Sequence, residues 1–306
     1  MLERSVRAWL TLPRRDQRAA LQGILDYLPE PVAAEGWNTR FGARSLYDAW
    51  SRTTLARGVY HANAAVLRPM IDGRSGWRLV EVGGGTGALW AHVLRPGDRG
   101  ELVLVDPVDE VHERVGAALP EGVRLVSMRD RVEEIELPPA EAVVCSLTLH
   151  HLAGADRSER RRHGLDGPGK AEVLAGMGEA VRGRAGLVLV NEADVYCDLG
   201  VPPGDEVLAD RIMDSYIRRT GLALLDDLRT REEAGEDLRA RWRAILHQWC
   251  LEQVAVVDRP VGERDVYELD VPRWLELFAR VGLEVVSRRF TDRYGLFCQY
   301  VLRPGA

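Results

Sequence analysis

Residues 79–87 read Leu-Val-Glu-Val-Gly-Gly-Gly-Thr-Gly, and the interpretation of the whole chain starts from this stretch. An apolar strand carries a carboxylate, Glu81, near its end and runs directly into a glycine-rich turn that leads to a helix. Glycines permit positive φ angles and let a ligand lie against bare backbone amides at a helix N-terminus. The stretch therefore predicts a turn that can bind a carboxylate or a phosphate.

A second carboxylate, Asp106, ends the next apolar segment, 25 residues after Glu81. In this topology a carboxylate at that position lies across the crevice from the glycine turn and accepts hydrogen bonds from both hydroxyls of a ribose. The two features together indicate an adenosine-type ligand. Two ligand classes stay open at this point, because Gly83, Gly85 and Ala88 also satisfy the G-x-G-x-x-G/A pattern of dinucleotide binding.

From Trp77 onward, short apolar strands alternate with helical segments, which is the pattern of βαβ units and a parallel sheet. The expected strands cover residues 78–82, 102–105, 123–126, 142–145 and 186–190. A later helix is expected to begin at Asp270 as N-cap, with Pro272 in its first turn, and to stop at Gly282. Two further strands are expected at residues 283–290 and 296–302, joined tightly at residues 292–295.

The segments on either side of this alternation are predicted to be helical, because apolar residues recur in them at helical spacing. Strand signals are absent before Gly76. We therefore expect four parts: an N-terminal helical cap (1–74), a Rossmann-like core (75–198), a helical insertion (199–262), and a C-terminal helix with antiparallel strands that complete the core (263–306).

The segment at residues 142–152 reads Ala-Val-Val-Cys-Ser-Leu-Thr-Leu-His-His-Leu, and it favours a different adenosine-type ligand over a dinucleotide. With Glu81 before the glycines, it makes the chain resemble the class I S-adenosylmethionine (SAM)-dependent methyltransferases, which have an E/D-x-G-x-G-x-G motif and a fourth strand ending in L-H-H. The resemblance covers about residues 77–198. It implies an α/β fold, a Rossmann-like sheet of seven strands with a reversed last hairpin, which a nicotinamide dehydrogenase would not need. The cap and the insertion between strands five and six are additions to this sheet.

The resemblance also implies SAM as cofactor and assigns the residues that hold it. Glu81, Gly83 and Gly85 correspond to the positions that hold the methionine part, and Asp106 corresponds to the ribose carboxylate. Asp130 and Arg131 correspond to the pair that flanks the adenine. The backbone of Cys145 and Leu147 corresponds to two positions that line the methionine end. The sequence departs from the family at two positions in or beside the fourth strand. Glu141 replaces the usual aspartate near the start of this strand, and Cys145 stands in place of serine or asparagine.

Side chains that act on the methyl acceptor are expected at the carboxyl ends of the strands, where ligands bind in open α/β sheets. This criterion selects candidate catalytic residues and their neighbours: His150, His151, Glu192, Asn191, Asp194 and Tyr196. It also admits residues of the N-terminal helices, which in similar enzymes fold over the cofactor: Tyr60, His61, Tyr47 and Trp50. Tyr60 is the aromatic candidate for a contact with the sulfonium. Each of these residues could instead have a purely structural role. Histidines can begin a helix, short carboxylates favour turns, and aromatic residues on a helix pack in the core.

The composition excludes several classes of protein. A chain of 306 residues with 46% hydrophobic and 29% charged residues is globular, and it has no apolar run long enough for a membrane span. A net charge of −6 supplies no positive field to hold nucleic acid. The four cysteines lie far apart, and neither a zinc-type spacing nor an HExxH motif occurs, so we expect no metal. With no secretory signal at the N-terminus, a cytoplasmic location is expected.

The sequence thus predicts a SAM-dependent methyltransferase that acts at O, C or N of a small, natural-product-like molecule, with the cap and insertion forming the acceptor pocket. Methyl transfer is an in-line displacement, so positioning supplies most of the catalysis, and a base is needed only to take a proton from the acceptor. Two alternatives stay open: an enzyme of this fold that cyclises SAM or transfers its aminocarboxypropyl group, and a non-catalytic SAM-binding partner subunit. A small-molecule acceptor is the expected partner, neither nucleic acid nor membrane is, and a homodimer is compatible with the sequence.

Overall fold

The computed structural model describes residues 50–152, 168–194 and 269–305, with a few shorter stretches at 4, 7–9, 11–12, 16, 219–223 and 226–227. The chain forms two compact units, one from residues 1–57 and 195–264 and the other from residues 58–194 and 265–306. Most residues of the predicted helices before residue 50 and between residues 208 and 249 lie outside the described ones, as do Tyr47 and Tyr196. The division into cap, core and insertion therefore stays a prediction.

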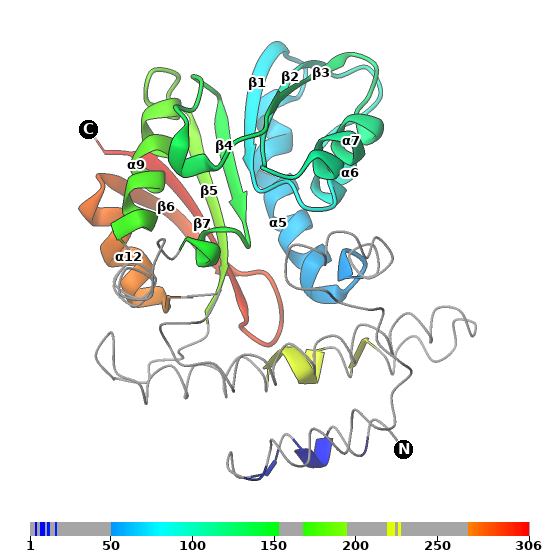
Figure 1. The fold of residues 1–306 in the computed structure, drawn as a ribbon, viewed down its shortest axis with the longest axis vertical. Helices are drawn as coiled ribbons and strands as arrows, with labels where there is room; N and C mark the ends of the chain where they lie inside the picture. Colours follow the sequence, from blue (N-terminus) through cyan, green and yellow to red (C-terminus); the bar gives the residue numbers. More distant parts are fainter. Residues whose placement is uncertain are drawn as a thin grey trace. The chain divides into compact units, whose positions relative to one another are not determined.

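The second unit contains a seven-stranded sheet in the order β3-β2-β1-β4-β5-β7-β6 (Figure 1). Its strands are β1 (Ser75–Val82), β2 (Arg99–Val105), β3 (Val123–Met128), β4 (Ala142–Ser146), β5 (Leu187–Ala193), β6 (Leu283–Phe290) and β7 (Phe297–Pro304). The first five strands pair in parallel, and β7 runs antiparallel to both β5 and β6. The predicted Rossmann-like sheet with a reversed last hairpin is confirmed, and the expected strands differ from the observed ones only at their ends.

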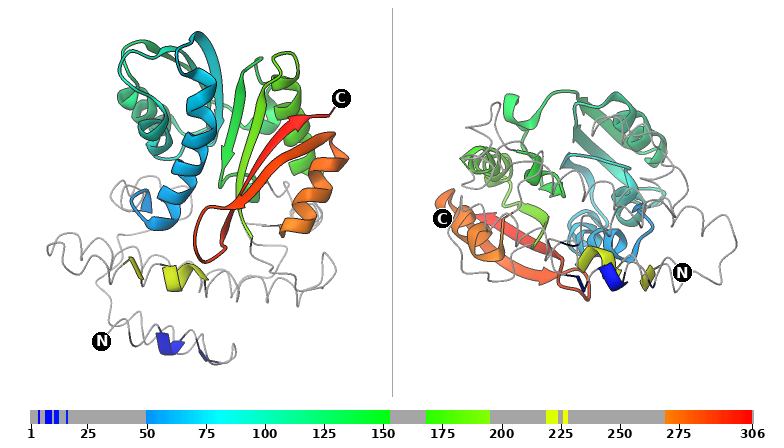
Figure 2. Two further views of the ribbon diagram at one scale, coloured as in Figure 1. Left: turned by 180° about the vertical axis from the view of Figure 1, so that it is seen from behind. Right: turned by 60° about the horizontal axis from the view of Figure 1, so that its bottom comes forward.

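Helices cover both faces of this sheet (Figure 2). They are α5 (Thr54–Ile71), α6 (Ala88–Val93), α7 (Asp109–Ala118), α9 (Pro168–Arg182) and α12 (Val271–Arg280), with short 3-10 turns η1 (Val132–Glu134) and η2 (Leu149–His151). One face carries α9 and α12, which contact β4, β5, β7 and β6. On the other face, α5 contacts Gln299 of β7, α6 contacts Glu81 of β1, and α7 lies beside Leu125 of β3. None of the helices in the described part of the chain is long and apolar enough to cross a membrane.

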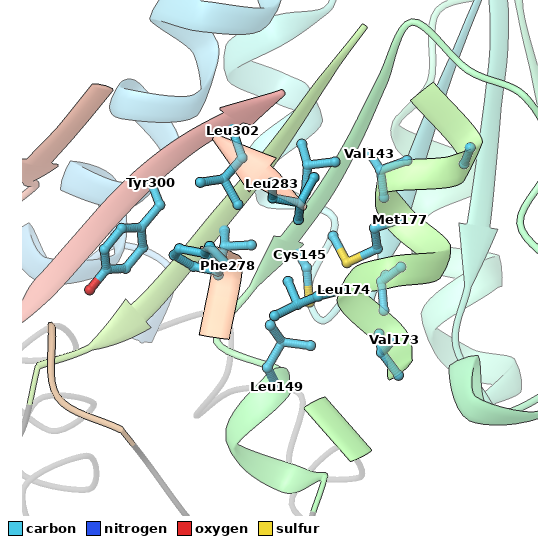
Figure 3. Close-up of a cluster of buried hydrophobic side chains, with 14 of the residues drawn as sticks. Val143, Cys145, Leu149, Val173, Leu174, Met177, Phe278, Leu283, Tyr300 and Leu302 are labelled. Atoms are coloured by element: carbon cyan, nitrogen blue, oxygen red, sulfur yellow. The ribbon is translucent and has the colours of Figure 1, made fainter. Parts of the chain in front are cut away.

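The main core lies between the sheet and the pair α9 and α12 (Figure 3). Cys145 of β4 and Tyr300 of β7 point into it, where they meet Met177 of α9 and Phe278 of α12. The Phe278 ring packs edge-on against Tyr300 with 5.0 Å between centroids. Successive side chains on a strand alternate between the two faces. Residues such as Glu81 that alternate with this core set therefore face α5, α6 and α7.

Local signals explain where α12 begins and ends. The Asp270 side chain accepts a hydrogen bond from the backbone N–H of Arg273 at 2.9 Å, and Pro272 lies in the first turn. Gly282 follows the helix with φ +74°, a conformation that glycine adopts without steric cost. The predicted N-cap, first-turn proline and stop are all confirmed.

Candidate functional site

The glycine turn after β1 is closely packed at one point and open at another. Gly83 has φ +75°, and its N–H donates to the carbonyl of Val105 at 2.9 Å. A Cβ at this position would collide with the side chain of Thr148, so only glycine fits. Gly85 has φ +52°, and a Cβ there would meet nothing within 4 Å. The turn is thus anchored against β2 and the end of β4, while Gly85 presents bare backbone to open space.

Glu81 lies beneath this turn and is only 4% exposed. Its Oε2 accepts a hydrogen bond at 2.5 Å from Nε1 of Trp90, which lies in α6, the helix after the glycine turn. Burial raises the pKa of the Glu81 carboxyl to about 8; the Trp90 hydrogen bond opposes this shift and the nearby charge of Asp106 adds to it. A carboxyl group in this state takes up or releases a proton near neutral pH, and a cation brought next to it favours the ionised form.

Asp106 is held at the end of β2 by the same turn. Its Oδ2 accepts from the N–H of Gly84 at 3.1 Å and its Oδ1 from the N–H of Val108 at 2.9 Å. Burial raises the pKa of this carboxyl, while the backbone hydrogen bonds of Val108 and Gly84 oppose the shift. Nε2 of the buried His112 donates to the Asp106 carbonyl at 2.7 Å, which fixes the backbone from the α7 side. The carboxylate is therefore oriented toward the glycine turn before any ligand arrives.

Helix α5 brings Tyr60 to the same turn. Burial raises the pKa of the Tyr60 hydroxyl to about 12; the side chain of Thr86 in the turn opposes this shift and the charge of Glu81 adds to it. The Tyr60 ring stacks on His92 of α6 with 5.8 Å between centroids. His61 also contacts His92, edge-on at 4.8 Å. A residue of the expected N-terminal helices thus lies close to the carboxylate and the turn.

The segment that follows β4 is held by Glu192 of β5, which is 1% exposed. Its Oε1 accepts from the N–H groups of Thr148 at 3.0 Å and Leu149 at 2.7 Å, and its Oε2 accepts from Nδ1 of His150 at 2.7 Å. An ionised carboxylate only accepts hydrogen bonds, so the proton of neutral His150 resides on Nδ1 and the lone pair on Nε2. Leu147 begins the segment with φ +55°, an unusual angle for a residue with a side chain.

The structure brings together most of the residues that the sequence selects. Glu81, Gly83, Gly85 and Asp106 meet at the glycine turn, with Tyr60 beside it. His150 and Glu192 form a pair, and the rings of His150 and His151 lie 4.2 Å apart, with His151 exposed. Asp194 is buried at the end of β5.

Other selected residues have surroundings different from those of this group. Asp130 and Arg131 are exposed after β3, where Arg131 pairs with Glu133 at 2.9 Å. The Cys145 side chain packs in the core on the opposite face, and burial raises the pKa of its thiol well above the usual value. Only its backbone is available at the end of β4, which is the role that the resemblance implies. Among the described residues, no three His, Cys, Asp or Glu side chains gather as metal ligands.

Several contacts of the site are not predicted by the sequence. Trp90 lies in the helix that follows the glycine turn, and nothing in the sequence indicates its hydrogen bond to Glu81. Thr148 fills the space beside Gly83 from a segment more than sixty residues away. The contact of Thr148 depends on β1 and β4 becoming neighbours in the sheet, and nothing local in the sequence reports it.

Comparison with solved structures supports the assignment of the fold. A chain of the complex between the Haloferax volcanii Trm112 methyltransferase activator and a methyltransferase matches at 12% identity, covering 90% of this chain and 100% of that one, with a TM-score of 0.50. Magnesium protoporphyrin IX methyltransferase from Synechocystis, solved with SAH, matches at 11% identity over 88% and 97%, with a TM-score of 0.49. LepI in complex with SAM matches at 14% identity over 78% of this chain but 46% of LepI, with a TM-score of 0.42. This chain therefore spans less than half the length of LepI. No protein-family model matches the sequence, and neither does any curated protein.

The likeness to the chain of the Haloferax volcanii complex agrees with the sheet topology. Dinucleotide-binding folds have the strand order 3-2-1-4-5-6 in a parallel sheet, whereas here an antiparallel β7 lies between β5 and β6. The protein has the Rossmann-like fold of class I SAM-dependent methyltransferases. The carboxyl ends of β1 and β4, where the strand order reverses, are the place where ligands bind in such sheets. The glycine turn, Asp106 and His150 all lie there.

Proposed function

We propose that this protein is a SAM-dependent methyltransferase that acts on a small molecule. The observation that carries the proposal is the convergence of two buried carboxylates, Glu81 and Asp106, on a glycine turn that is open at Gly85. The donor set suits SAM, because Glu81 can receive its ammonium group and Asp106 the hydroxyls of its ribose. The fold supports the proposal, since the turn lies where the strand order reverses.

Other residues complete the proposed cofactor site. Gly83 and Gly85 would hold the methionine part together with the backbone of Cys145 and Leu147, and Asp130 and Arg131 would flank the adenine. Tyr60 would cover the turn from α5. Bound SAM would supply an electrophilic methyl group on a positively charged sulfur, and the aromatic face of Tyr60 suits that charge.

The pair of His150 and Glu192 is the proposed proton acceptor. Because Glu192 holds the proton on Nδ1, the His150 ring can take a proton from an acceptor hydroxyl or amine at Nε2. The imidazolium formed in that step is stabilised by the Glu192 carboxylate, whose Oε2 lies 2.7 Å from Nδ1. His151, whose ring touches His150, would help to bind the acceptor. Whether the acceptor reacts at O, N or C decides how much this base contributes.

The cofactor is tested by calorimetric titration of the full chain with SAM, with S-adenosylhomocysteine and with NADH. We expect both sulfur nucleosides to bind and NADH not to bind. Asp106→Asn should weaken SAM binding by at least about tenfold, since a charge-assisted hydrogen bond is lost. Glu284→Gln is the matched control, because Glu284 pairs with Arg303 on β6 and β7, away from the turn. Binding of NADH in place of SAM would reject the proposal.

The reaction is tested by mass spectrometry of the nucleoside product during turnover with small hydroxylated, carboxylic and amine acceptors. S-adenosylhomocysteine indicates methyl transfer, whereas methylthioadenosine would indicate attack on the aminocarboxypropyl chain. SAM binding without any product until a second protein is added would indicate a partner subunit. The small-molecule acceptor, the exclusion of nucleic acid, a cytoplasmic location and a homodimer are parts of this proposal that rest on the sequence.

The base is tested with His150→Ala, Glu192→Ala and the neighbouring His151→Ala. We expect His150→Ala to lower turnover by about 10²–10⁴-fold while SAM affinity stays close to that of the unaltered protein. Glu192→Ala should lower both turnover and stability, because two backbone N–H groups lose their acceptor as well. Equal turnover in all three variants and the unaltered protein would leave positioning as the source of catalysis and remove the base.

A further inference from the structure

One row of polar residues crosses four strands of the sheet on the face that carries α5. Ser146 of β4 is paired with Asn191 of β5, Asn191 with Gln299 of β7, and Gln299 with Arg289 of β6. Asn191 and Gln299 are almost fully buried. Buried positions of a central sheet are normally apolar. A continuous polar row there needs a reason.

Asn63 of α5 closes this row into a cluster. Its Oδ1 accepts hydrogen bonds from Nδ2 of Asn191 at 2.9 Å and from Nε2 of Gln299 at 2.8 Å, and its Nδ2 donates to Oγ of Ser146 at 3.0 Å. Nδ2 of Asn191 also donates to the same Oγ at 3.1 Å. Arg289 links the far end, donating to Oε1 of Gln299 at 2.9 Å and to a backbone carbonyl of α5, that of Ala62, also at 2.9 Å.

The cluster allows one setting of α5 on the sheet. Asn63 is fully buried and uses both ends of its amide, so turning or sliding the helix would leave several buried donors and acceptors without partners. Apolar packing by the neighbouring buried residues Val59 and Leu67 is less selective, because hydrophobic contact is not directional. The cluster is also not arranged for stability alone, since Oδ1 of Asn191 is buried with no hydrogen-bond partner.

Tyr60 lies three residues before Asn63, so both side chains project from one face of the helix. Tyr60 stacks on His92 of α6, the helix into which the glycine turn leads, and Asn63 bonds Ser146 at the end of β4. The two contacts are made to the helix that follows β1 and to the end of β4, on either side of the point where the strand order reverses. A shift of Asn63 would therefore move Tyr60 relative to the turn.

We infer that Asn63 is a positioning residue for the cofactor site: the amide cluster sets α5 so that Tyr60 closes on the glycine turn, and in this way it determines the affinity for SAM. The inference rests on the proposed function. It adds to that function a residue which touches neither the turn nor the proposed base. Its effect on the cofactor passes through Tyr60.

The test is a double-mutant cycle of Asn63→Leu and Tyr60→Phe, with SAM dissociation constants measured by calorimetry on the full chain. We expect Asn63→Leu to weaken SAM binding by about tenfold and Tyr60→Phe by a similar factor. If Asn63 acts through Tyr60, the double variant is no weaker than Asn63→Leu alone. Turnover at saturating SAM should change much less than the Michaelis constant for SAM. Independent effects that multiply in the double variant would overturn the inference.

Glu141→Gln is the control for a loss of stability without loss of the site. Glu141 is a buried carboxylate at the opposite end of β4, where it accepts from the N–H of Arg78 and from the side chain of Arg184, each at 2.6 Å. It should lower the melting temperature and leave SAM affinity within about twofold. If Asn63→Leu lowers SAM affinity no more than this control does, Asn63 is merely structural and the inference is wrong.

Two further measurements keep the inference testable. Should Asn63→Leu not fold, Gln299→Met breaks the bond to Asn63 from the strand side with little change in volume, and the same loss of SAM affinity is expected. Failure of the proposed function looks different, because the unaltered protein would then not bind SAM at all, and the inference would fail with it. SAM binding that is unchanged in both cluster variants overturns the inference alone.

Discussion

At the scale of single residues, the most consequential group is Glu81. The sequence predicts a carboxylate before the glycines, and the structure adds that this carboxylate is buried against Trp90 and carries a pKa raised to about 8. Its charge in the ligand-free protein is therefore set by pH in the neutral range. Both ligand binding and stability should follow that titration.

SAM binding is expected to release a proton from Glu81. Below pH 8 the ligand-free carboxyl is largely protonated, whereas a bound ammonium group favours the ionised form, so affinity should rise from pH 6 to about 8 and then level off. Calorimetry in two buffers with different ionisation enthalpies measures the released proton. Glu81→Gln should remove this component and leave only the titration of the ligand itself. An unchanged pH profile in the variant would contradict the role of Glu81.

The same pKa predicts how stability depends on pH in the absence of ligand. A carboxyl whose pKa is raised in the folded state contributes stability that is fully present below its unfolded value of 4.5 and is lost progressively as the pH rises to about 8. Relative to Glu81→Gln, the free energy of unfolding should therefore fall over this window, by an amount on the order of a few kcal/mol. Urea denaturation of both proteins at pH 5, 7 and 9 checks the sign. Parallel curves would show that Glu81 stays ionised.

At the scale of elements, helix α12 follows from local signals. Asp270 caps it, and removing that cap by Asp270→Ala should lower the free energy of unfolding by about 1 kcal/mol. Asp270→Asn is the control, because asparagine is an equally good N-cap and should cost only a few tenths of a kcal/mol. Urea denaturation of the three proteins measures both differences, and equal losses in the two variants would show that the cap contributes nothing.

The segment after β4 contains an unfavourable backbone angle, in contrast to the stabilising cap of α12. Leu147 adopts φ +55°, which costs about 1–2 kcal/mol for a residue with a Cβ. Leu147→Gly should therefore be more stable than Leu147→Ala by about 1 kcal/mol, although alanine is normally the more stabilising of the two. Thermal denaturation of the two variants measures the difference. A more stable alanine variant would mean that the segment relaxes to a negative φ.

At the scale of the whole molecule, the sheet is built from two distant stretches of sequence. Strands β1 to β5 come from residues 75–193, while α12, β6 and β7 come from residues 271–304. Without the second stretch, β5 would become an open edge, and the core would lose Trp274, Phe278 and Tyr300. A chain ending at residue 268 should therefore lack a cooperative thermal transition and aggregate, as judged against the full chain by circular dichroism and sedimentation. A sharp transition in the short chain would show that the first five strands suffice.

The sequence predicts what depends on local pattern and leaves out what depends on sheet order. The strands, the glycine turn and the α12 cap follow from apolar periodicity, positive-φ glycines and an Asp-x-Pro start. The contacts of Asn63 with the strand row do not, because they join residues that become neighbours only when β4, β5 and β7 lie side by side. The hydrogen bond from Trp90 to Glu81 spans nine residues, but no apolar or turn pattern in the sequence indicates it. The angle at Leu147 is equally hidden, since leucine gives no sign of a left-handed backbone.

The position of Gln299 in the amide cluster has a consequence for synthesis. The glycine turn leaves the ribosome roughly 200 residues before Gln299 does, and the chain in between is made at about 5–20 residues per second. Once Leu147 has emerged, the nascent chain carries every group proposed to touch SAM, yet the setting of α5 over the turn still waits for the strand that arrives last. SAM would then bind only after the last strand of the sheet has been synthesised. It would therefore be a ligand of the completed sheet and would not nucleate folding.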